Sequence, residues 1–188
     1  LSDPGCGLAD LGAGDVVILP AFGVTVRLLD QLQRQGCVLV DTTCGSVRNV
    51  WKNVRQYARD GYTAVIHGKM HHEETQATAS HAIEHPKGRY LVVLNRAEAS
   101  TVCAYIRDGR DRSAFLDQFR AAASPGFDPD RDLERVGLAN QTTMLMSESL
   151  EIAEMFREAM TARHGGAGLA GRFRAFETIC SATQDRQE

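Results

Sequence analysis

Two cysteines stand in matching sequence contexts that could present reactive thiolates. Residues 38–47 read VLVDTTCGSV around Cys44, and residues 176–187 read FETICSATQDRQ around Cys180. In each stretch an apolar run of strand character passes an acid and a threonine, reaches the cysteine and continues into a helix start. Unpaired N–H groups at a helix start favour the thiolate, the form that binds iron or attacks a disulfide. The alternative is a pair of small buried core residues, but the matched contexts favour function.

A second stretch, HGKMHHEET at residues 67–75, concentrates histidines and carboxylates just after a predicted strand. Imidazoles there could donate to an anion, and a carboxylic acid could supply protons. The alternative is a solvated polar turn that caps a helix. Neither the HExxH zinc pattern nor a CxxC pair is present in the sequence.

A third stretch, ANQTTML at residues 139–145, also follows a predicted strand and offers Gln141, Thr142 and Thr143. Its amide and hydroxyls could bind a polar substrate and relay a proton, or could cap the next helix. The remaining cysteines, Cys6, Cys37 and Cys103, lack the matched context and are interpreted as structural. Four other histidines are interpreted as ordinary polar residues: His67, His81, His85 and His164.

The elements that must position these residues alternate between strand and helix. Apolar runs predict strands within residues 15–20, 37–41, 62–68, 89–95 and 135–141. Helical spacing predicts helices within residues 24–36, 44–61, 73–85, 95–106, 112–124 and 147–166. This alternation predicts an α/β fold with a parallel sheet, in which the two cysteine-bearing junctions fall on successive domains.

Composition limits the class of protein. The 188 residues carry a net charge of −3 with a pI near 6.1, and the basic residues are scattered, so neither nucleic acid nor an anionic membrane is an expected partner. The longest apolar stretch is too short to span a bilayer, and no secretory signal is evident. An odd count of five cysteines favours a reducing compartment, cytoplasmic or plastid-like. The chain begins at Leu1 and stops at Glu188, and we expect it to be a piece of a longer protein.

Four segments together resemble the 4-hydroxy-3-methylbut-2-enyl diphosphate reductases, the terminal enzymes of the non-mevalonate isoprenoid pathway. DTTCGSVRNVW, HGKMHHEETQATAS, NQTTML and TICSATQDRQ occur in the family's order and at compatible spacing. The PAFG at residues 20–23 and the HGK..HEET form are similar to the plant and cyanobacterial branch.

The resemblance implies an α/β protein of three domains in pseudo-threefold arrangement around a [4Fe–4S] cluster, with one iron not bound by protein thiolate. Cys44 and Cys180 would be two of three cysteine ligands, with the third outside this chain. Residues 1–43 would end the first domain, residues 44–176 would form the second, and residues 177–188 would begin the third. The fragment alone would be inactive.

The resemblance also implies reductive dehydroxylation of an allylic diphosphate to isopentenyl and dimethylallyl diphosphates, with electrons from a donor such as ferredoxin or flavodoxin. Glu74 would deliver the proton that lets the hydroxyl leave as water, and Thr142 would lie near the substrate oxygen. His72 would hold the diphosphate, and Gln141 is a further substrate-binding candidate. Phe22 departs from many bacterial members, which have a diphosphate-binding histidine there. The loop that clamps the diphosphate would lie beyond Glu188, and the compartment would be cytoplasm, or plastid stroma in a plant.

Two alternatives use the same residues differently. A non-catalytic α/β module would bind an anionic ligand and keep its cysteines only in the core. A thiol redox enzyme would use Cys44 as nucleophile, although the sequence offers no evident resolving partner.

Overall fold

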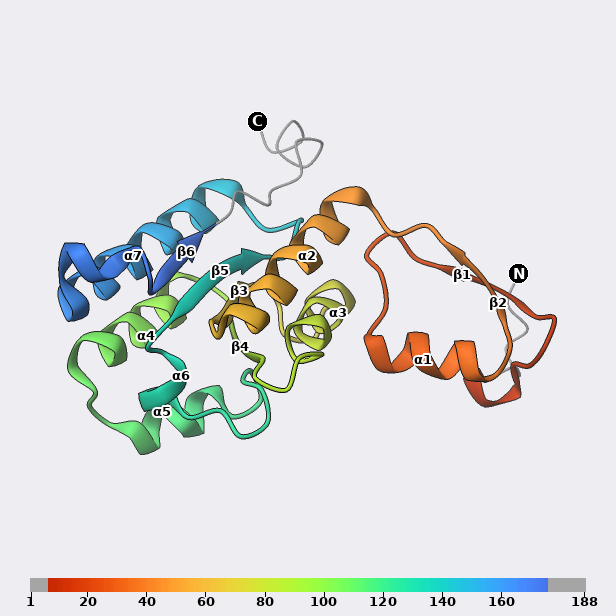
Figure 1. The fold of residues 1–188 in the computed structure, drawn as a ribbon, viewed down its shortest axis with the longest axis horizontal. Helices are drawn as coiled ribbons and strands as arrows, with labels where there is room; N and C mark the ends of the chain where they lie inside the picture. The colour runs from red at the N-terminus through yellow and green to blue at the C-terminus, as the bar shows by residue number, and fades with distance from the viewer. Residues whose placement is uncertain (1–6, 176–188) are drawn as a thin grey trace.

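The computed structural model describes residues 7–175 of the chain (Figure 1). Its elements in chain order are η1 (Leu8–Asp10), β1 (Val16–Leu19), α1 (Val26–Arg34), β2 (Val38–Asp41), α2 (Gly45–Asp60), β3 (Thr63–His67), α3 (Glu73–Ala82), β4 (Arg89–Val93), α4 (Arg96–Asp108), α5 (Arg112–Phe119), α6 (Pro129–Asp132), β5 (Val136–Asn140), α7 (Met146–Leu169) and β6 (Phe173–Ala175). The strands form a two-stranded sheet, β1–β2, and a four-stranded sheet in the order β4–β3–β5–β6. All pairings within these two sheets are parallel, which confirms the predicted fold class.

The four-stranded sheet is covered by helices on both faces, as parallel sheets require. Because side chains alternate along a strand, Ala64 and Ile66 of β3 pack with α2 and α3, whereas Val65 packs with α4, α5 and α7. All five residues of β3 and of β5 are buried, so these strands form the centre of the core. The register sets His67 at the end of β3 opposite Asn140 at the end of β5. The loops that follow both strands therefore leave the same edge of the sheet.

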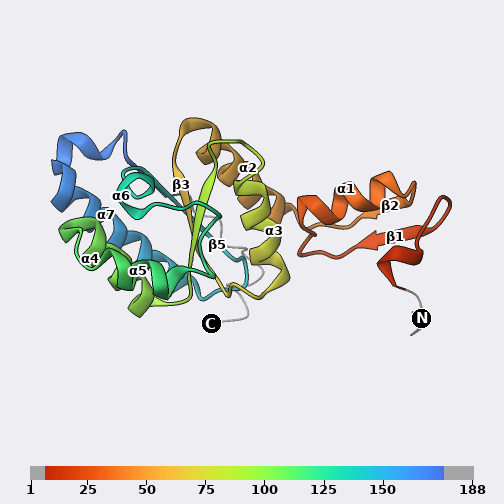
Figure 2. The same ribbon diagram turned by 90° about the horizontal axis from the view of Figure 1, so that it is seen from below.

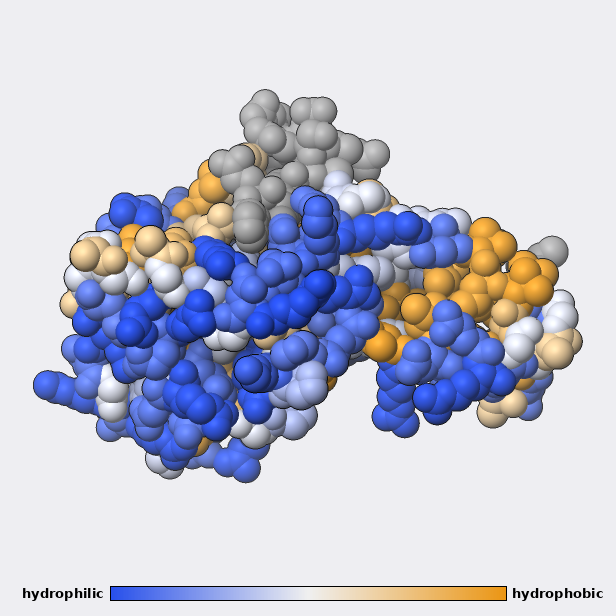
Figure 3. All heavy atoms as spheres, in the orientation of Figure 1, coloured by the Kyte–Doolittle hydropathy of each residue, from blue (hydrophilic) through white to orange (hydrophobic). Residues whose placement is uncertain are grey.

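The two-stranded sheet lies with α1 at one end of the molecule, away from the larger sheet (Figures 1 and 2). One of its faces is apolar and open to solvent, because Val16, Ile18, Val38 and Val40 are 64%, 67%, 53% and 43% exposed. Paired register places Val16 beside Val38 and Ile18 beside Val40, and Figure 3 shows the resulting hydrophobic surface over β1 and β2.

Close packing joins α2 to β5 and to the turn between β1 and α1. Tyr57 lies over Gly137 of β5, where an added Cβ would come within 2.6 Å of its ring, and its hydroxyl donates to the Leu138 carbonyl at 2.8 Å. At the other end of α2, an added Cβ on Gly23 would lie 2.3 Å from the Trp51 ring. Gly23 also has a φ of 78°, in the left-handed region that favours glycine. The Trp51 contact and the left-handed backbone therefore both require glycine at residue 23.

Several predicted helix ends differ from the structure, including those of α5 and α7. The helix expected over residues 112–124 ends at Phe119, because the following residues pair with the edge of β4. Val92 N–H donates to Ala122 O at 2.8 Å, and Ser124 N–H donates to Tyr90 O at 3.0 Å. The last helix continues past residue 166 to Leu169, across a non-helical Gly165. Among the helices that the structure describes, none is long and apolar enough to cross a membrane.

Candidate functional site

Glu74 and Thr142 meet at the carboxyl edge of the four-stranded sheet. Glu74 lies in the first turn of α3, after β3, and Thr142 lies in the loop after β5. Both residues are buried, with Glu74 only 2% exposed. Thr142 donates its backbone N–H to Glu74 Oε1 at 2.5 Å. Two residues that the sequence predicts for one site are therefore in direct contact.

His72 caps the start of α3 next to Glu74. Its Nδ1 accepts the Glu74 backbone N–H at 3.1 Å, which assigns the imidazole proton to Nε2 when the ring is neutral. The side chain is half-exposed, so Nε2–H is able to donate to a ligand from solvent. The histidine has the capping role of the alternative interpretation, and its Nε2–H is left available for a ligand.

Gln141 joins the two loops from within the protein. Its Oε1 accepts from Lys69 N–H and from Thr75 Oγ1–H, each at 3.1 Å, and its Nε2 donates to Thr143 Oγ1 at 2.6 Å. The residue is 3% exposed. Gly68 permits this approach, because a Cβ there would lie 2.7 Å from Thr75 Oγ1 and 3.1 Å from Gln141 Cβ. Gln141 organises the site, and its oxygen is already engaged by two donors.

Cys44 occupies the junction between β2 and α2, where the sequence places it. It is the N-cap residue of α2 and is exposed, so the interpretation of Cys44 as a buried core cysteine is wrong. Its N–H donates to Ala21 O at 2.8 Å. Cys103, in contrast, is 1% exposed, and burial raises the pKa of its thiol to about 12, which fits the structural role predicted for it. Cys180 and Cys6 lie outside the described residues.

Asp41 stabilises the junction before Cys44 through contacts with Thr43 and Arg48. Its Oδ1 accepts the Thr43 N–H at 2.9 Å, and its Oδ2 lies 2.7 Å from Arg48 Nη2 on α2. Hydrogen bonds from the Thr43 hydroxyl and N–H, with the Arg48 charge, lower the pKa of the Asp41 carboxyl. The acid and threonine that precede the cysteine therefore shape the turn that presents the thiol.

A path of contacts links the Cys44 junction to the Glu74–Thr142 pair. Ala21 accepts from Cys44 N–H, and the next residue, Phe22, lies edge-on to the His72 ring at a centroid distance of 6.2 Å. His72 in turn caps the helix that carries Glu74. The Phe22 ring thus lies between the Cys44 junction and the residue that caps α3.

The fit to an iron–sulfur cluster is partial within the described residues. Cys44 offers an exposed thiol at the start of α2. In residues 7–175, no group of three or more His, Cys, Asp or Glu side chains converges as a metal site. Of the three cysteines in residues 7–175, Cys44 is the one that is exposed.

Two histidines interpreted as ordinary polar residues are deeply buried. His67 is 1% exposed and His81 is 3% exposed. Burial lowers the pKa of His67, while the Glu148 charge and the Leu94 backbone oppose this shift. The burial of His67 was predictable from the sequence, because this residue ends an apolar run that predicts a buried strand.

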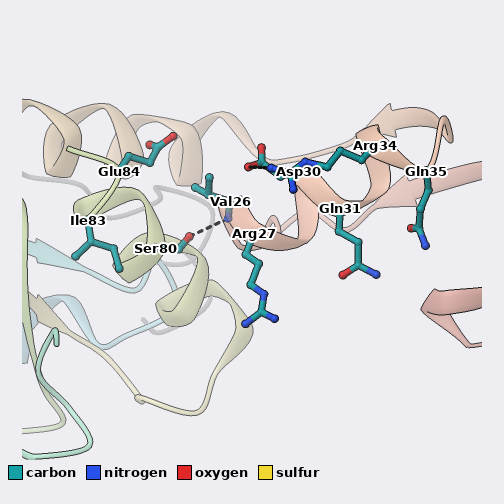
Figure 4. Close-up of a pocket in the computed structure, with 9 residues that line it drawn as sticks. All are labelled: Val26, Arg27, Asp30, Gln31, Arg34, Gln35, Ser80, Ile83 and Glu84. Atoms are coloured by element: carbon teal, nitrogen blue, oxygen red, sulfur yellow. Dashed lines mark hydrogen bonds and ion pairs between the residues drawn. The ribbon is translucent and has the colours of Figure 1, made fainter. Parts of the chain in front are cut away.

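A cavity of about 640 Å³ lies elsewhere, between α1 and α3 (Figure 4). The two helices are connected by a hydrogen bond from Val26 N–H to Ser80 Oγ at 3.1 Å. The residues that line the cavity include no predicted site residue: Val26, Arg27, Asp30, Gln31, Arg34, Gln35, Ser80, Ile83 and Glu84. The predicted site residues Glu74 and Thr142 lie instead beyond the ends of β3 and β5, at the edge where parallel α/β folds place ligands.

The chain is similar in sequence to known proteins. A 4-hydroxy-3-methylbut-2-enyl diphosphate reductase of Synechococcus sp. (strain RCC307) is 53% identical over 176 residues, which make up 94% of this chain and 42% of that protein. The enzyme of the same name from Gloeobacter violaceus (strain ATCC 29082 / PCC 7421) is 55% identical over 174 residues, 93% of this chain and 40% of that protein. The chain thus spans about two-fifths of the length of these relatives.

Two solved structures share the fold. A structure of (E)-4-hydroxy-3-methyl-but-2-enyl diphosphate reductase matches 99% of this chain and 51% of its own, with a TM-score of 0.68 and 22% identity. The E-1-hydroxy-2-methyl-but-2-enyl-4-diphosphate reductase from Plasmodium falciparum matches 96% of this chain and 45% of its own, with a TM-score of 0.64 and 18% identity. The family model described as LytB protein matches residues 1–188, and the chain therefore belongs to the LytB protein family.

Proposed function

We propose that the complete protein reduces 4-hydroxy-3-methylbut-2-enyl diphosphate to isopentenyl and dimethylallyl diphosphates, the final step of the non-mevalonate pathway. The observation that carries this proposal is the contact between Glu74 and Thr142 beside the helix cap at His72, in a member of the LytB family. The exposed thiol of Cys44 counts against the alternative of a non-catalytic module with core cysteines only.

The reaction consumes two electrons and two protons, because a C–O bond is replaced by a C–H bond and the hydroxyl leaves as water. When bound, a [4Fe–4S] cluster with one iron free of protein thiolate would supply the electrons and Lewis acidity for this step. Cys44 and Cys180 would hold it together with a cysteine outside this chain. A ferredoxin or flavodoxin is the proposed electron donor, and the cytoplasm, or the stroma of a plastid, the proposed compartment.

The described residues have distinct parts in this scheme. Glu74 delivers a proton to the leaving oxygen, and the Thr142 N–H keeps its carboxylate aimed at that position. His72 donates from Nε2 to the diphosphate, since its Nδ1 is held by the Glu74 N–H. Gln141 is proposed as a further substrate contact. Its Oε1 already accepts two hydrogen bonds and its Nε2 donates one, so the second N–H of Nε2 is the donor left for a substrate.

The proposed division into domains places residues 1–43 in the first domain, residues 44–176 in the second and residues 177–188 in the third. It is supported by the separation of β1–β2 from the four-stranded sheet, with α2 beginning just after Cys44.

The complete protein, reconstituted anaerobically with iron and sulfide, tests the function. We expect a visible and paramagnetic-resonance cluster signal, and water release from the allylic diphosphate with a chemical reductant. Cys44→Ser should lose the cluster, whereas Cys103→Ala, at a buried cysteine, should keep it. A protein with neither cluster nor turnover, and a Cys44→Ser variant identical to its parent, would contradict the proposal.

A further inference from the structure

His67 contacts both ends of the loop that carries Thr142. This loop, residues 141–145, runs from the end of β5 to the start of α7. At the entrance to the loop, Gln141 donates its backbone N–H to the His67 carbonyl at 2.8 Å. Beyond the exit, His67 Nδ1 lies 2.8 Å from Ser149 Oγ in the first turns of α7. His67 therefore contacts the chain on both sides of the loop, through its backbone carbonyl before the loop and through its side chain after it.

The surroundings of the imidazole determine how it binds Ser149. His67 Nε2 is buried without a hydrogen-bond partner among the described residues, and Glu148 Oε2 lies 3.8 Å away from it. A carboxylate repels a nitrogen lone pair and attracts an N–H, so the position of Glu148 favours the tautomer with the proton on Nε2. Nδ1 is then the acceptor, and the Ser149 hydroxyl donates to it.

Glu148 extends the same contact to a third element. Its Oε1 accepts from the backbone N–H of Arg96, the first residue of α4, at 3.3 Å. The starts of α4 and α7 and the end of β3 are thus joined around one buried ring. Since the loop has only five residues between two such anchors, its backbone N–H groups have little freedom.

We propose that His67 is a positioning residue that, through Ser149, sets the distance from the Thr142 N–H to the Glu74 carboxylate. Its catalytic consequence rests on the proposed function, because Glu74 is the proton donor there. His67 touches neither the predicted thiolate ligand nor His72 among the described contacts. Its removal is therefore expected to lower kcat while leaving KM, which reflects diphosphate binding, nearly unchanged.

Ser149→Ala in the complete protein is the first test. Alanine has the higher helix propensity, so a loosened loop could not be attributed to a weaker α7. Loss of this one partly buried hydrogen bond predicts a kcat lower by about tenfold, with amide exchange at Thr142 faster by a similar factor. Ser149→Thr, which keeps the hydroxyl, should restore both values. Ser147→Ala, at an exposed serine two residues earlier, is the matched control and should change neither.

A pair of His67 variants separates the two ring nitrogens. Asparagine places its amide near the position of Nδ1, and glutamine places its amide near that of Nε2. Thr142 amide exchange should therefore be closer to the parent in His67→Asn than in His67→Gln. Hydrogen–deuterium exchange is independent of turnover, so a complete protein without reductase activity would count against the proposed function alone. Unchanged Thr142 exchange in Ser149→Ala and in His67→Gln would overturn the positioning role, and so would a lower kcat without faster exchange.

Discussion

The Thr142 backbone N–H donates to the Glu74 carboxylate at 2.5 Å across 68 residues of sequence. The contact exists because β3 and β5 are neighbours in a parallel sheet and end at the same level, at His67 and Asn140. A main-chain donor cannot be removed by a side-chain substitution, so the carboxylate keeps one partner in any variant that preserves the loop. The pair is thus the structural centre of the proposed site.

Glu74→Gln should abolish turnover while the cluster signal is retained. The amide oxygen is still able to accept from Thr142 N–H, but the group has no acidic proton, and a general acid contributes about 10²–10⁴ in rate. Steady-state turnover and visible spectra of the reconstituted complete protein measure the two effects. Glu73→Gln, at the adjacent exposed acid, is the control and should remain active. Full activity of Glu74→Gln would exclude Glu74 as the proton donor.

Gly23→Ala should destabilise the protein by about 2–4 kcal/mol, because the left-handed backbone and the Trp51 ring both oppose a Cβ. Gly14→Ala is a matched control, since Gly14 has a φ of 97° but nothing within 4 Å of the added Cβ. That change should cost only about 1 kcal/mol. Urea unfolding measures both free energies, and equal losses would show that the Trp51 contact contributes nothing.

His81 should make the stability fall as the pH drops below about 6.5, the ordinary pKa of histidine. Burial lowers the pKa of His81 in the folded state, with Glu84 opposing, so the unfolded chain binds the proton more readily. Stability is then lost with decreasing pH, by at most about 1.4 kcal/mol per pH unit from this group, until the pH passes below the folded pKa.

Unfolding free energies at pH 7.5 and 5.5 measure this loss. His81→Gln should reduce the difference between the two pH values. The same pH difference in parent and His81→Gln would assign the pH dependence to another group.

The apolar face of β1–β2 should cause self-association of the 188-residue chain in solution. Ile18→Thr with Val40→Thr keeps β-branched residues in both strands and removes two exposed apolar side chains. Sedimentation velocity of this double variant should show more monomer than the parent. Leu150→Thr, at a leucine on α7 that is 46% exposed, should not change the distribution.

Local sequence was sufficient for the longer elements and for the ends of their strands, but it did not predict the short elements η1, α6 and β6. The apolar runs predicted β3 and β5 because both are buried on their two faces, and Cys44 was correctly placed at a helix start. The helix expected through residue 124 was wrong, because Ala122 and Ser124 exchange helical hydrogen bonds for pairing with β4. That pairing depends on a strand about 30 residues earlier, which local propensity does not report.

By itself, the sequence determined the alternation of strands and helices and the chemistry available after each strand. Only the tertiary structure decided which of these groups meet. Parallel pairing of β3 with β5 sets Glu74 against Thr142, and the same register buries His67 beneath the first turns of α7. The physical reason is that hydrophobic periodicity specifies which face of an element is buried, whereas the partner across that face follows from sheet order and register. His67, interpreted from the sequence as an ordinary polar residue, thus contacts the chain on both sides of the loop that carries Thr142.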